Sequence, residues 1–352
     1  MALSPKTKTL LKTLTLIILL AGLCGGGWAA YYYLTYYHPN IQTHSKNHAY
    51  VFIPGGGDFA GLLDSLDAQN LLKNPKSFLR AAEKEKLPQR IKGGRYRLDN
   101  RLGNKAAVRI FTLGLQSPVQ LTISGSIRNM ERLAGILARP IEADSLQCWQ
   151  ALHDEALLQS LGMDSTSLFA FILPNTYEIY WNTPPEKLLE KLHAEYQSFW
   201  NEERRQKAKT IGMTPLEVSI LASILNEETR YEPEMPTMAG VYINRLRLKI
   251  PLQADPTVKF ALRDPSIRRV LYKHLEVDSP YNTYKHTGLP PGPICVPTIA
   301  CVDAVLNYQT HNYLYFCASP DFNGSHLFAT DLKGHNKNAK AFHKALNERN
   351  IK

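Results

Sequence analysis

An uncharged stretch near the N-terminus, residues 14–34 (LTLIILLAGLCGGGWAAYYYL), restricts this chain more than any other feature. About twenty consecutive apolar residues form a helix long enough to cross the hydrocarbon core of a bilayer. Lys6, Lys8 and Lys12 precede the stretch, and by the positive-inside rule they keep the N-terminus in the cytoplasm. The sequence therefore predicts a single-pass protein of the cytoplasmic membrane, with residues 38–352 outside the cytoplasm.

Two other interpretations of this stretch were weighed. A cleaved signal peptide is usually shorter, and a cluster of tyrosines (Tyr31, Tyr32, Tyr33, Tyr36 and Tyr37) stands where its cleavage site would be. A lipid attachment site at Cys24 would have a small residue where this chain has Leu23. The tyrosines instead fit the aromatic belt at the end of a membrane helix, which favours an uncleaved anchor.

Charge and cysteine content narrow the possible partners. Lys and Arg number 41 against 31 Asp and Glu, a net charge of +10 that suits an anionic partner such as nucleic acid, a lipid surface or an acidic polymer. The basic residues form no long run and no nucleic-acid motif, so we expect no nucleic-acid partner. The five cysteines are odd in number and contain no CxxC, which argues against a zinc ribbon or a disulfide scaffold.

The 352 residues are enough for two or three domains. After a tail (1–13) and the membrane helix (14–34), we expect a linker (35–47) and a small α+β module (48–118). In and just after that module the patterns predict strands at 49–54, 93–98 and 119–124 and helices at 58–72, 75–86 and 104–114, with Asp58 as an N-cap. A larger α+β domain (119–352) follows. Residues 126–200 are mostly helical but broken at 171–181, where Pro174 and Asn175 make a turn, and the part beyond 201 is dense in polar loops.

The stretch SILASILNEETRYEP (219–233) carries two glutamates at the end of an apolar helix. Thr214 and Glu217 fit a capping box with proline between them, so the helix begins at about 215. Glu228 continues the face of Leu221 and Leu225, whereas Glu227 lies about 100° round the helix.

This periodicity predicts that Glu228 is the buried carboxyl group, with a raised pKa that suits a general acid. The alternative is that both glutamates lie in water at a frayed helix end.

Three loops downstream have a composition suited to sugars: LQADPTV (252–258), SPYNTYKHTGLPPGPI (279–294) and HLFATDLKGHN (326–336). They are rich in Pro and Gly and carry planar hydrogen-bonding groups and aromatic faces. Asp255 precedes a proline, and we expect it to cap a helix rather than to take part in chemistry.

Five segments in order resemble the YceG-like endolytic murein transglycosylases: FILPNTYEIY, ILASILNEET, GVYINRLRLKIPLQADPTV, SPYNTYKHTGLPPGPI and GSHLFATDLKGHN. The resemblance covers residues 48–348. It implies one N-terminal membrane helix, a LysM-like module at 48–118 and a catalytic domain at 119–352. The family's catalytic glutamate directly precedes Thr or Ser, which maps it onto Glu228 before Thr229. Family members often have an acidic residue where this chain has Asn226.

What the resemblance implies is cleavage of the β-1,4 bond between N-acetylmuramic acid and N-acetylglucosamine without water, leaving a 1,6-anhydro end and limiting the length of nascent strands. Glu228 would serve as acid and then base, assisted by the substrate's acetamido group. Gln253, Asn282 and Tyr284 are candidates to hold the acetamido group and hydroxyls, and Tyr281 to form a wall; turn-capping and core roles are equally open for each. We expect no cofactor and no metal. The expected partners are peptidoglycan strands, the cytoplasmic membrane and peptidoglycan synthases.

Two rival functions stay open at this point. Six histidines in the last eighty residues or so (His274, His286, His311, His326, His335 and His343) suggest a metal-dependent hydrolase, but the chain has no HExxH and no helical histidine pair. A non-catalytic cell-wall-binding or scaffold protein is the second rival, since the small module alone would support binding.

Overall fold

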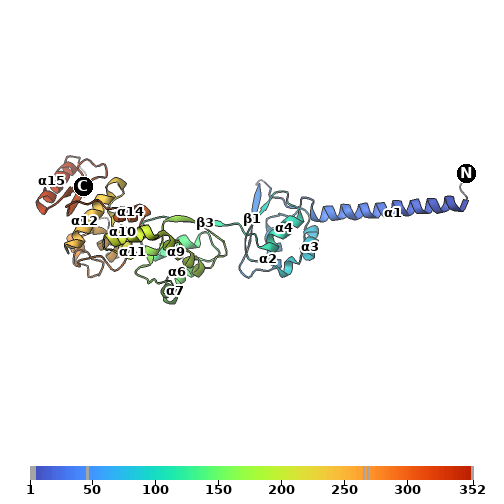
Figure 1. The fold of residues 1–352 in the computed structure, drawn as a ribbon, viewed down its shortest axis with the longest axis horizontal. Coiled ribbons are helices and arrows are strands. Elements are labelled where there is room, and N and C mark those ends of the chain that lie inside the picture. The colour runs from blue at the N-terminus through green and yellow to red at the C-terminus, as the bar shows by residue number, and fades with distance from the viewer. Residues whose placement is uncertain (1–4, 45–46, 265, 268, 350–352) are drawn as a thin grey trace. The chain divides into compact units, whose positions relative to one another are not determined.

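The computed structural model describes residues 5–44, 47–264, 266–267 and 269–349 (Figure 1). It is a mixed α+β structure with one N-terminal apolar helix. The strands are β1 (His48–Ile53), β2 (Gly94–Asp99), β3 (Val119–Ile123), β4 (Asn175–Ile179), β5 (Tyr315–Ala318) and β6 (His326–Ala329). The first helices are α1 (Pro5–Tyr36), α2 (Phe59–Ala68), α3 (Pro75–Lys84), α4 (Asn104–Leu113), α5 (Met130–Ala138), α6 (Ser145–Leu152), α7 (Glu155–Ser160) and α8 (Leu168–Phe171). The later helices are α9 (Pro185–Phe199), α10 (Glu202–Thr210), α11 (Pro215–Glu228), α12 (Met235–Arg247), α13 (Asp255–Leu262), α14 (Ile299–Leu306) and α15 (Leu332–Glu348), with short 3₁₀ turns at Leu87–Gln89, Glu232–Glu234 and Tyr272–Glu276.

The chain forms two compact units. The first comprises Met1–Val119 and a short return segment, Ile179–Asn182; the second comprises Gln120–Glu178 and Thr183–Lys352. The sequence did not predict the return of residues 179–182 to the first unit. There Trp181 packs edge-on against Phe52 of β1 at 5.1 Å between ring centroids. The LysM-like character of the first unit stays a prediction.

A small core holds the first unit together. β1 pairs with β2 in antiparallel register, His48 opposite Asp99 and Ile53 opposite Gly94. Alternate strand residues and the inner faces of α2, α3 and α4 are buried together: Val51, Ile53, Leu62, Leu66, Phe78, Tyr96, Leu98 and Phe111. The strands and helices predicted from 49 to 114 are confirmed, with ends moved by a few residues. Asp58 caps α2 as predicted, its carboxylate accepting from the Gly61 N–H at 2.9 Å.

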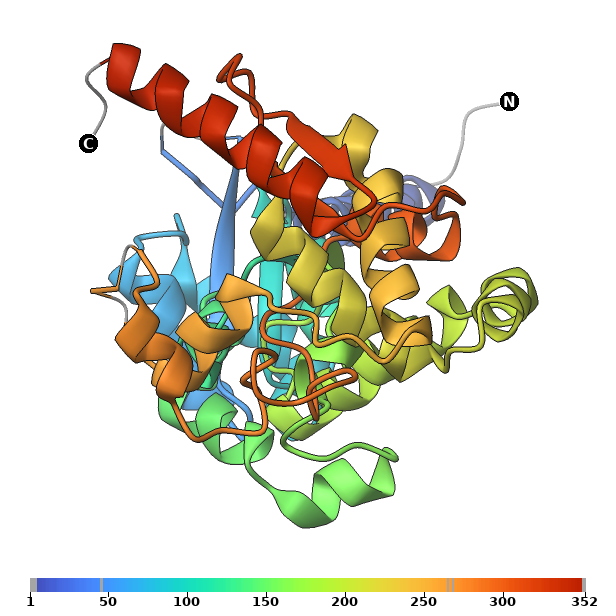
Figure 2. The same ribbon diagram turned by 90° about the vertical axis from the view of Figure 1, so that its left-hand side faces the viewer.

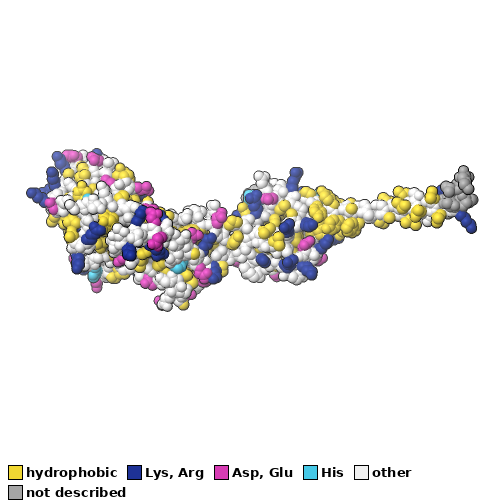
Figure 3. Space-filling view, in the orientation of Figure 1, with side chains coloured by type: hydrophobic (Ala, Val, Ile, Leu, Met, Phe, Trp, Pro, Cys, Tyr) yellow, Lys and Arg dark blue, Asp and Glu magenta, His cyan; other side chains and the backbone are white. Residues whose placement is uncertain are grey.

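The apolar helix α1 is longer than the predicted stretch, and its part from Leu10 to Tyr36 has the length and composition of a membrane span. Figure 3 shows a largely hydrophobic surface along it. By length and composition alone it fits either a membrane anchor or a signal sequence. Lys84 of α3 lies over the rings of Tyr32 and Tyr36 near its end, at 4.7 and 4.6 Å from the ring centroids.

The predicted linker 35–47 is structured over much of its length. Pro39 and Ile41 form isolated β-bridges with Gly103 and Leu72, and Ile41 is fully buried in the first core. Asn104 connects the pieces through a buried amide. It donates to the Thr35 carbonyl at 2.8 Å and to Ser77 Oγ at 2.9 Å, and it accepts from Asn40 Nδ2 at 2.7 Å. Residues 35–44 are therefore part of the first unit.

The second unit buries its main core in the region beyond residue 201, which we predicted to consist of polar loops. α11 packs against α12, α13 and α14, and their inner residues form one cluster with α9 and α10: Tyr196, Trp200, Ala208, Leu221, Leu225, Met238, Tyr242, Val302 and Val305. That prediction was wrong because these helices are short and surrounded by loops, so their apolar residues form no long run. β5 and β6 form an antiparallel hairpin against which α15 lies (Figure 2).

Residues 171–181 were predicted to interrupt the helices with a turn at Pro174 and Asn175; in the structure residues 175–179 form β4, which pairs with β3 in a two-stranded sheet. Thr122 and Thr176 hydroxyls lie 3.0 Å apart across it. The turn signal of Pro174 and Asn175 thus marks only the start of the strand. Tyr177, in the middle of β4, is buried and donates its hydroxyl to the Leu173 carbonyl at 2.7 Å.

We predict that Asn104→Ala destabilises the first unit by about 1–3 kcal/mol, because it leaves the buried Asn40 amide and Thr35 carbonyl without their partner. Hydrogen exchange of the β1 and β2 amides measures this, since it reports opening of that unit alone. Asn336→Ala, at an exposed position of α15, is the control. Equal protection in Asn104→Ala and wild type would contradict the role given to Asn104.

Candidate active site

The helix α11 that carries the two glutamates begins where the sequence predicted. Thr214 Oγ1 accepts from the Glu217 N–H at 3.2 Å, and Glu217 Oε2 accepts from the Thr214 N–H at 2.7 Å, which completes the capping box. The helix ends at Glu228, and Thr229 leaves it in an extended conformation. Glu228 is therefore the last helical residue, beside the unsatisfied carbonyl groups of the C-terminal turn.

The periodicity argument that singled out Glu228 was not sufficient. Every residue from 218 to 226 is buried, so α11 has no solvent face in that range. The side chain of Glu227 is only 4% exposed and pairs with Arg128, whose own side chain is 60% exposed. Both glutamates are thus enclosed, and the alternative of a frayed end in water is wrong. What separates them is the partner that each one meets.

Glu228 meets a hydroxyl rather than a cation. Tyr242 of α12, a residue only 2% exposed, donates its hydroxyl to Glu228 Oε1 at 2.9 Å. The Glu228 residue as a whole is half-buried, so solvent reaches part of it. Burial raises the pKa of Glu228 to about 7; the hydrogen bond from Tyr242 opposes this rise, the negative charge of Asp255 adds to it, and Lys259 opposes it weakly. At neutral pH a large share of Glu228 therefore carries a proton.

Asn226, which stands where the resembled family often has an acidic residue, braces the same helix end. Its Nδ2 donates to Ser126 Oγ at 2.8 Å, and its Oδ1 accepts from the Thr298 N–H at 3.3 Å. An amide donates and accepts at once, whereas a carboxylate only accepts. Asn226 Nδ2 also donates to Glu227 Oε1 at 3.2 Å, a bond that a carboxylate at this position could not form, so Asn226 has a structural role.

Gln253 lies on the loop between α12 and α13 and is exposed. Its backbone is left-handed, with φ of 53°, and its N–H donates to the Thr283 carbonyl at 3.0 Å. Its Oε1 accepts from Arg245 Nη1 at 3.2 Å. Arg245 is three residues after Tyr242 on α12, so Gln253 connects to the Glu228 pair through one helix.

Asp255 and Tyr284 form a second pair. The Tyr284 hydroxyl donates to Asp255 Oδ1 at 2.7 Å, and burial together with this bond raises the pKa of Tyr284 well above its ordinary value. The prediction that Asp255 caps a helix was wrong. The N-cap of α13 is Ala254, and Asp255 is the first helical residue with no side-chain capping bond. Its carboxylate is therefore directed to Tyr284 rather than to its own helix.

The other two predicted binding residues, Asn282 and Tyr281, lie in different surroundings. Asn282 is fully buried, and its amide donates to the Leu275 and Val277 carbonyls at 2.8 and 2.9 Å. This is the turn-bracing role that we left open, and it leaves no donor for a sugar. Tyr281 is half-buried and packs on Phe260 of α13 at 4.8 Å between ring centroids. Its role as a wall stays a prediction.

Sequence reasoning missed Tyr242, Arg245 and Arg128. Arg245 is buried, and it donates to the carbonyls of Leu314, Pro251 and Leu252 at 2.8, 3.0 and 2.8 Å. A tyrosine and an arginine three positions apart, and so on one face of α12, was the available signal for two of them. Arg128 precedes Glu227 by almost a hundred residues, so nothing local reveals that pair.

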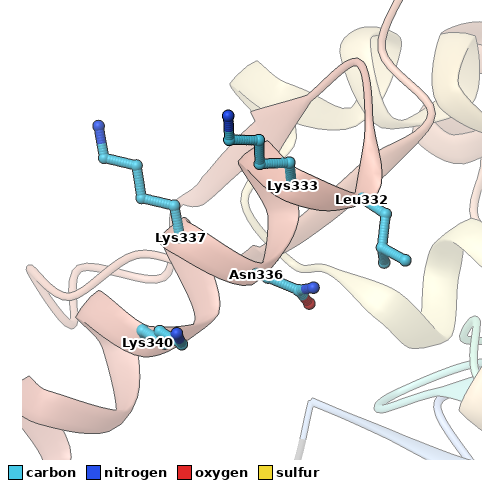
Figure 4. A pocket seen from close by; sticks show the side chains of 5 residues that line it. All are labelled: Leu332, Lys333, Asn336, Lys337 and Lys340. Carbon is cyan, nitrogen blue, oxygen red and sulfur yellow. The ribbon is translucent and has the colours of Figure 1, made fainter.

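The late histidines brace loops individually. His311 contacts the Thr237 carbonyl at 2.8 Å, and His326 contacts Glu234 at 3.2 Å. Over the ranges that the structure describes, no three His, Cys, Asp or Glu side chains gather as a metal site would require. A hollow of about 590 Å³ lies on α15, lined by Leu332, Lys333, Asn336, Lys337 and Lys340 (Figure 4). It includes none of the predicted site residues.

Fold and site together define an α+β protein with a half-buried carboxyl group of raised pKa at the end of α11, beside Tyr242 of α12. The chain belongs to the YceG-like family, whose model matches residues 51–341. The endolytic murein transglycosylase of Bacillus subtilis (strain 168) is 28% identical over 88% of this chain and 89% of the relative. That of Streptococcus pneumoniae serotype 2 (strain D39) is 24% identical over 92% of this chain, which spans 64% of the relative. A crystal structure of a YceG-like protein from Listeria monocytogenes has a TM-score of 0.55 and 24% identity, covers 83% of this chain and 99% of that one, and shows the shared fold.

We predict that Tyr242→Phe raises the pKa of Glu228 above its wild-type value of about 7, because it removes a hydrogen bond to the charged form. Carbon NMR of the labelled Glu228 carboxyl, followed over pH, measures the change directly. Tyr308→Phe, which removes a hydroxyl that bonds only Arg247 in the described part of the chain, is the matched control. A lowered or unchanged Glu228 pKa in Tyr242→Phe would contradict this account.

Glu228 should also affect stability with a defined sign. Its folded pKa of about 7 lies above the ordinary 4.5, so the folded protein binds more protons between these values and loses stability as pH rises through them. Glu228→Gln should therefore be more stable than wild type at pH 8, by about 1–3 kcal/mol after allowance for its partial exposure, and close to wild type near pH 4. Chemical denaturation at both pH values measures this, with Glu195→Gln at an exposed position of α9 as the control. A difference of equal size at both pH values would rule out the linkage.

Proposed function

We propose that this protein is a membrane-anchored endolytic lytic transglycosylase of peptidoglycan, with Glu228 as its catalytic acid. The observation that carries the proposal is the half-buried Glu228 carboxyl, whose pKa of about 7 keeps a proton available at neutral pH. The family of the chain supports the same reaction class, as do its relatives, which are named endolytic murein transglycosylases.

The proposed reaction needs one carboxyl group in two protonation states. Glu228 gives its proton to the oxygen that leaves the muramic anomeric carbon, and Tyr242 stabilises the carboxylate that results. The carboxylate then takes the proton of the muramic C6 hydroxyl, which attacks the anomeric carbon and closes a 1,6-anhydro ring. A group with a pKa near the working pH suits both steps, because it gives up and regains a proton at little cost.

Gln253 and Tyr284 are the binding residues that we retain. Gln253 is exposed and fixed through Arg245, and Tyr284 is fixed on Asp255, so both side chains are held before substrate arrives. Tyr281 is proposed as an aromatic wall. Asn282 is left out of the proposal because its amide is used within its own loop.

For the rest of the chain we propose an arrangement that matches this substrate. α1 anchors the protein in the cytoplasmic membrane with the N-terminus inside, and the first unit is a LysM-like module that holds glycan. Cleavage close to the membrane limits the length of nascent strands and makes peptidoglycan synthases natural partners. The net charge of +10 suits a polymer that carries peptide carboxylates.

The decisive experiment compares wild type with Glu228→Gln on purified murein, with the products identified by mass spectrometry. Wild type should release anhydro-muropeptides, with turnover falling as pH rises through about 7, because the acid loses its proton. Glu228→Gln should lose this activity by at least about a hundredfold and still bind murein. Glu195→Gln serves as the control.

Other products separate the rival functions. Reducing ends from wild type would indicate a hydrolase, and binding without any product would indicate a scaffold. Full activity in Glu228→Gln would remove this residue from the mechanism.

A further inference from the structure

Asp255 carries a carboxyl group that its own helix does not use. It is the first residue of α13 but forms no side-chain capping bond, and it is exposed to solvent. In the described part of the chain its carboxylate is held by the Tyr284 hydroxyl at 2.7 Å, a bond to Oδ1. Tyr284, on the loop that packs beside α13, thus orients the exposed carboxylate of Asp255. The first residue of a helix does not need such a contact.

Asp255 lies near Glu228. Its negative charge raises the pKa of Glu228, and the charge of Glu228 in turn raises the pKa of Tyr284. Hydrogen bonds join the same residues: Glu228 bonds Tyr242, Arg245 of the same helix bonds Gln253, and Gln253 precedes Asp255 by two positions. α13 also packs against α11. Glu228 and Asp255 therefore belong to one site.

We propose that Asp255, oriented by Tyr284, is a second catalytic residue, which accepts a hydrogen bond from the acetamido N–H of the muramic residue whose glycosidic bond breaks. The inference rests on the proposed function and adds a role for a residue that we expected to be structural.

The proposed step balances without any added reagent. The bond between the muramic anomeric carbon and the leaving oxygen breaks, and its electron pair goes to that oxygen, which takes the Glu228 proton. The acetamido oxygen attacks the anomeric carbon and forms a bicyclic oxazolinium ion, with the positive charge shared by the nitrogen. The C6 oxygen then attacks the same carbon as Glu228 takes its proton, and the acetamido group is restored.

A carboxylate suits this position because the charge develops on the group that it would contact. The N–H of the intermediate is cationic, and a charge-assisted hydrogen bond is about twice as strong as a neutral one. Tyr284 fixes the carboxylate beforehand, so no reorganisation is needed when the charge appears. The same negative charge keeps the proton on Glu228. The two carboxyl groups thus lie in different environments, Glu228 half-buried beside Tyr242 and Asp255 exposed and held by Tyr284, as an acid and a charged acceptor require.

The test uses the full-length chain and glycan strands freed of peptides. Asp255→Asn should lower kcat by about a hundredfold or more and leave KM within about threefold, because the lost charge acts only in the transition state. A bicyclic thiazoline analogue of the intermediate, used as an inhibitor, should bind at least about tenfold more weakly to this variant than to wild type.

The pH profile separates this role from mere support of the fold. The groups that interact with Glu228 are Tyr242 from α12, Asp255 and Lys259 from α13, and Tyr284; Arg245 of α12 acts on Tyr242 and Tyr284. Removing the Asp255 charge should lower the Glu228 pKa, so the alkaline limb of kcat should move to lower pH. Tyr284→Phe keeps the charge but releases the carboxylate, so kcat should fall by about tenfold with the limb unmoved.

Asp264→Asn, just after α13 and bonded to the Ser266 N–H, is the matched control and should equal wild type. Asp255→Asn with wild-type kcat and an unmoved limb would overturn the inference. If Asp255→Asn fails to fold, Tyr284→Phe and Asp255→Glu decide: wild-type kcat and wild-type thiazoline binding in both would overturn it. Absence of anhydro products from wild type would instead overturn the proposed function itself.

Discussion

The hydrogen bond between the Tyr242 hydroxyl and the Glu228 carboxyl is the contact on which the site depends. Glu228 ends α11, where the helix carbonyls leave a partial negative charge that disfavours a carboxylate. Burial acts in the same direction. Without a donor, the pKa of this carboxyl group would be higher still; with Tyr242 it is about 7. A carboxyl group with this pKa can both donate a proton and take one back near neutral pH.

The second unit is built to keep that contact fixed. Tyr242 and Arg245 stand on one face of α12, and Arg245 connects the helix to β5 through the Leu314 carbonyl and to the next loop through the Leu252 carbonyl. That loop continues into Asp255 and α13. A buried arginine is costly unless its donors are satisfied, and here backbone carbonyls satisfy them. The position of Asp255 relative to Glu228 therefore depends on structural hydrogen bonds that take no part in the proposed reaction.

The sequence could predict those features that are determined by residues close together in the chain. The capping box at Thr214, the N-cap Asp58 and the strands and helices of residues 49–114 depend on local patterns, and they are confirmed. The interpretations that failed depend on distant partners. Residues 35–44 join the first core through Asn104, Asp255 turns to Tyr284 rather than to its helix, and the core beyond 201 is assembled from short segments. No periodicity encodes such pairings, because each is set by where two segments meet in space.

The neighbouring glutamates illustrate the same limit at the site itself. One step along the helix turns each side chain towards a different segment. Glu227 meets the guanidinium of Arg128, a counter-charge that favours the charged form of a carboxyl group, whereas Glu228 meets a neutral hydroxyl. Chemically equal residues thus meet different partners, each of them far away in sequence. Resemblance to a family selected Glu228, and the contacts supply the physical reason that periodicity could not: a proton is retained where the partner carries no charge.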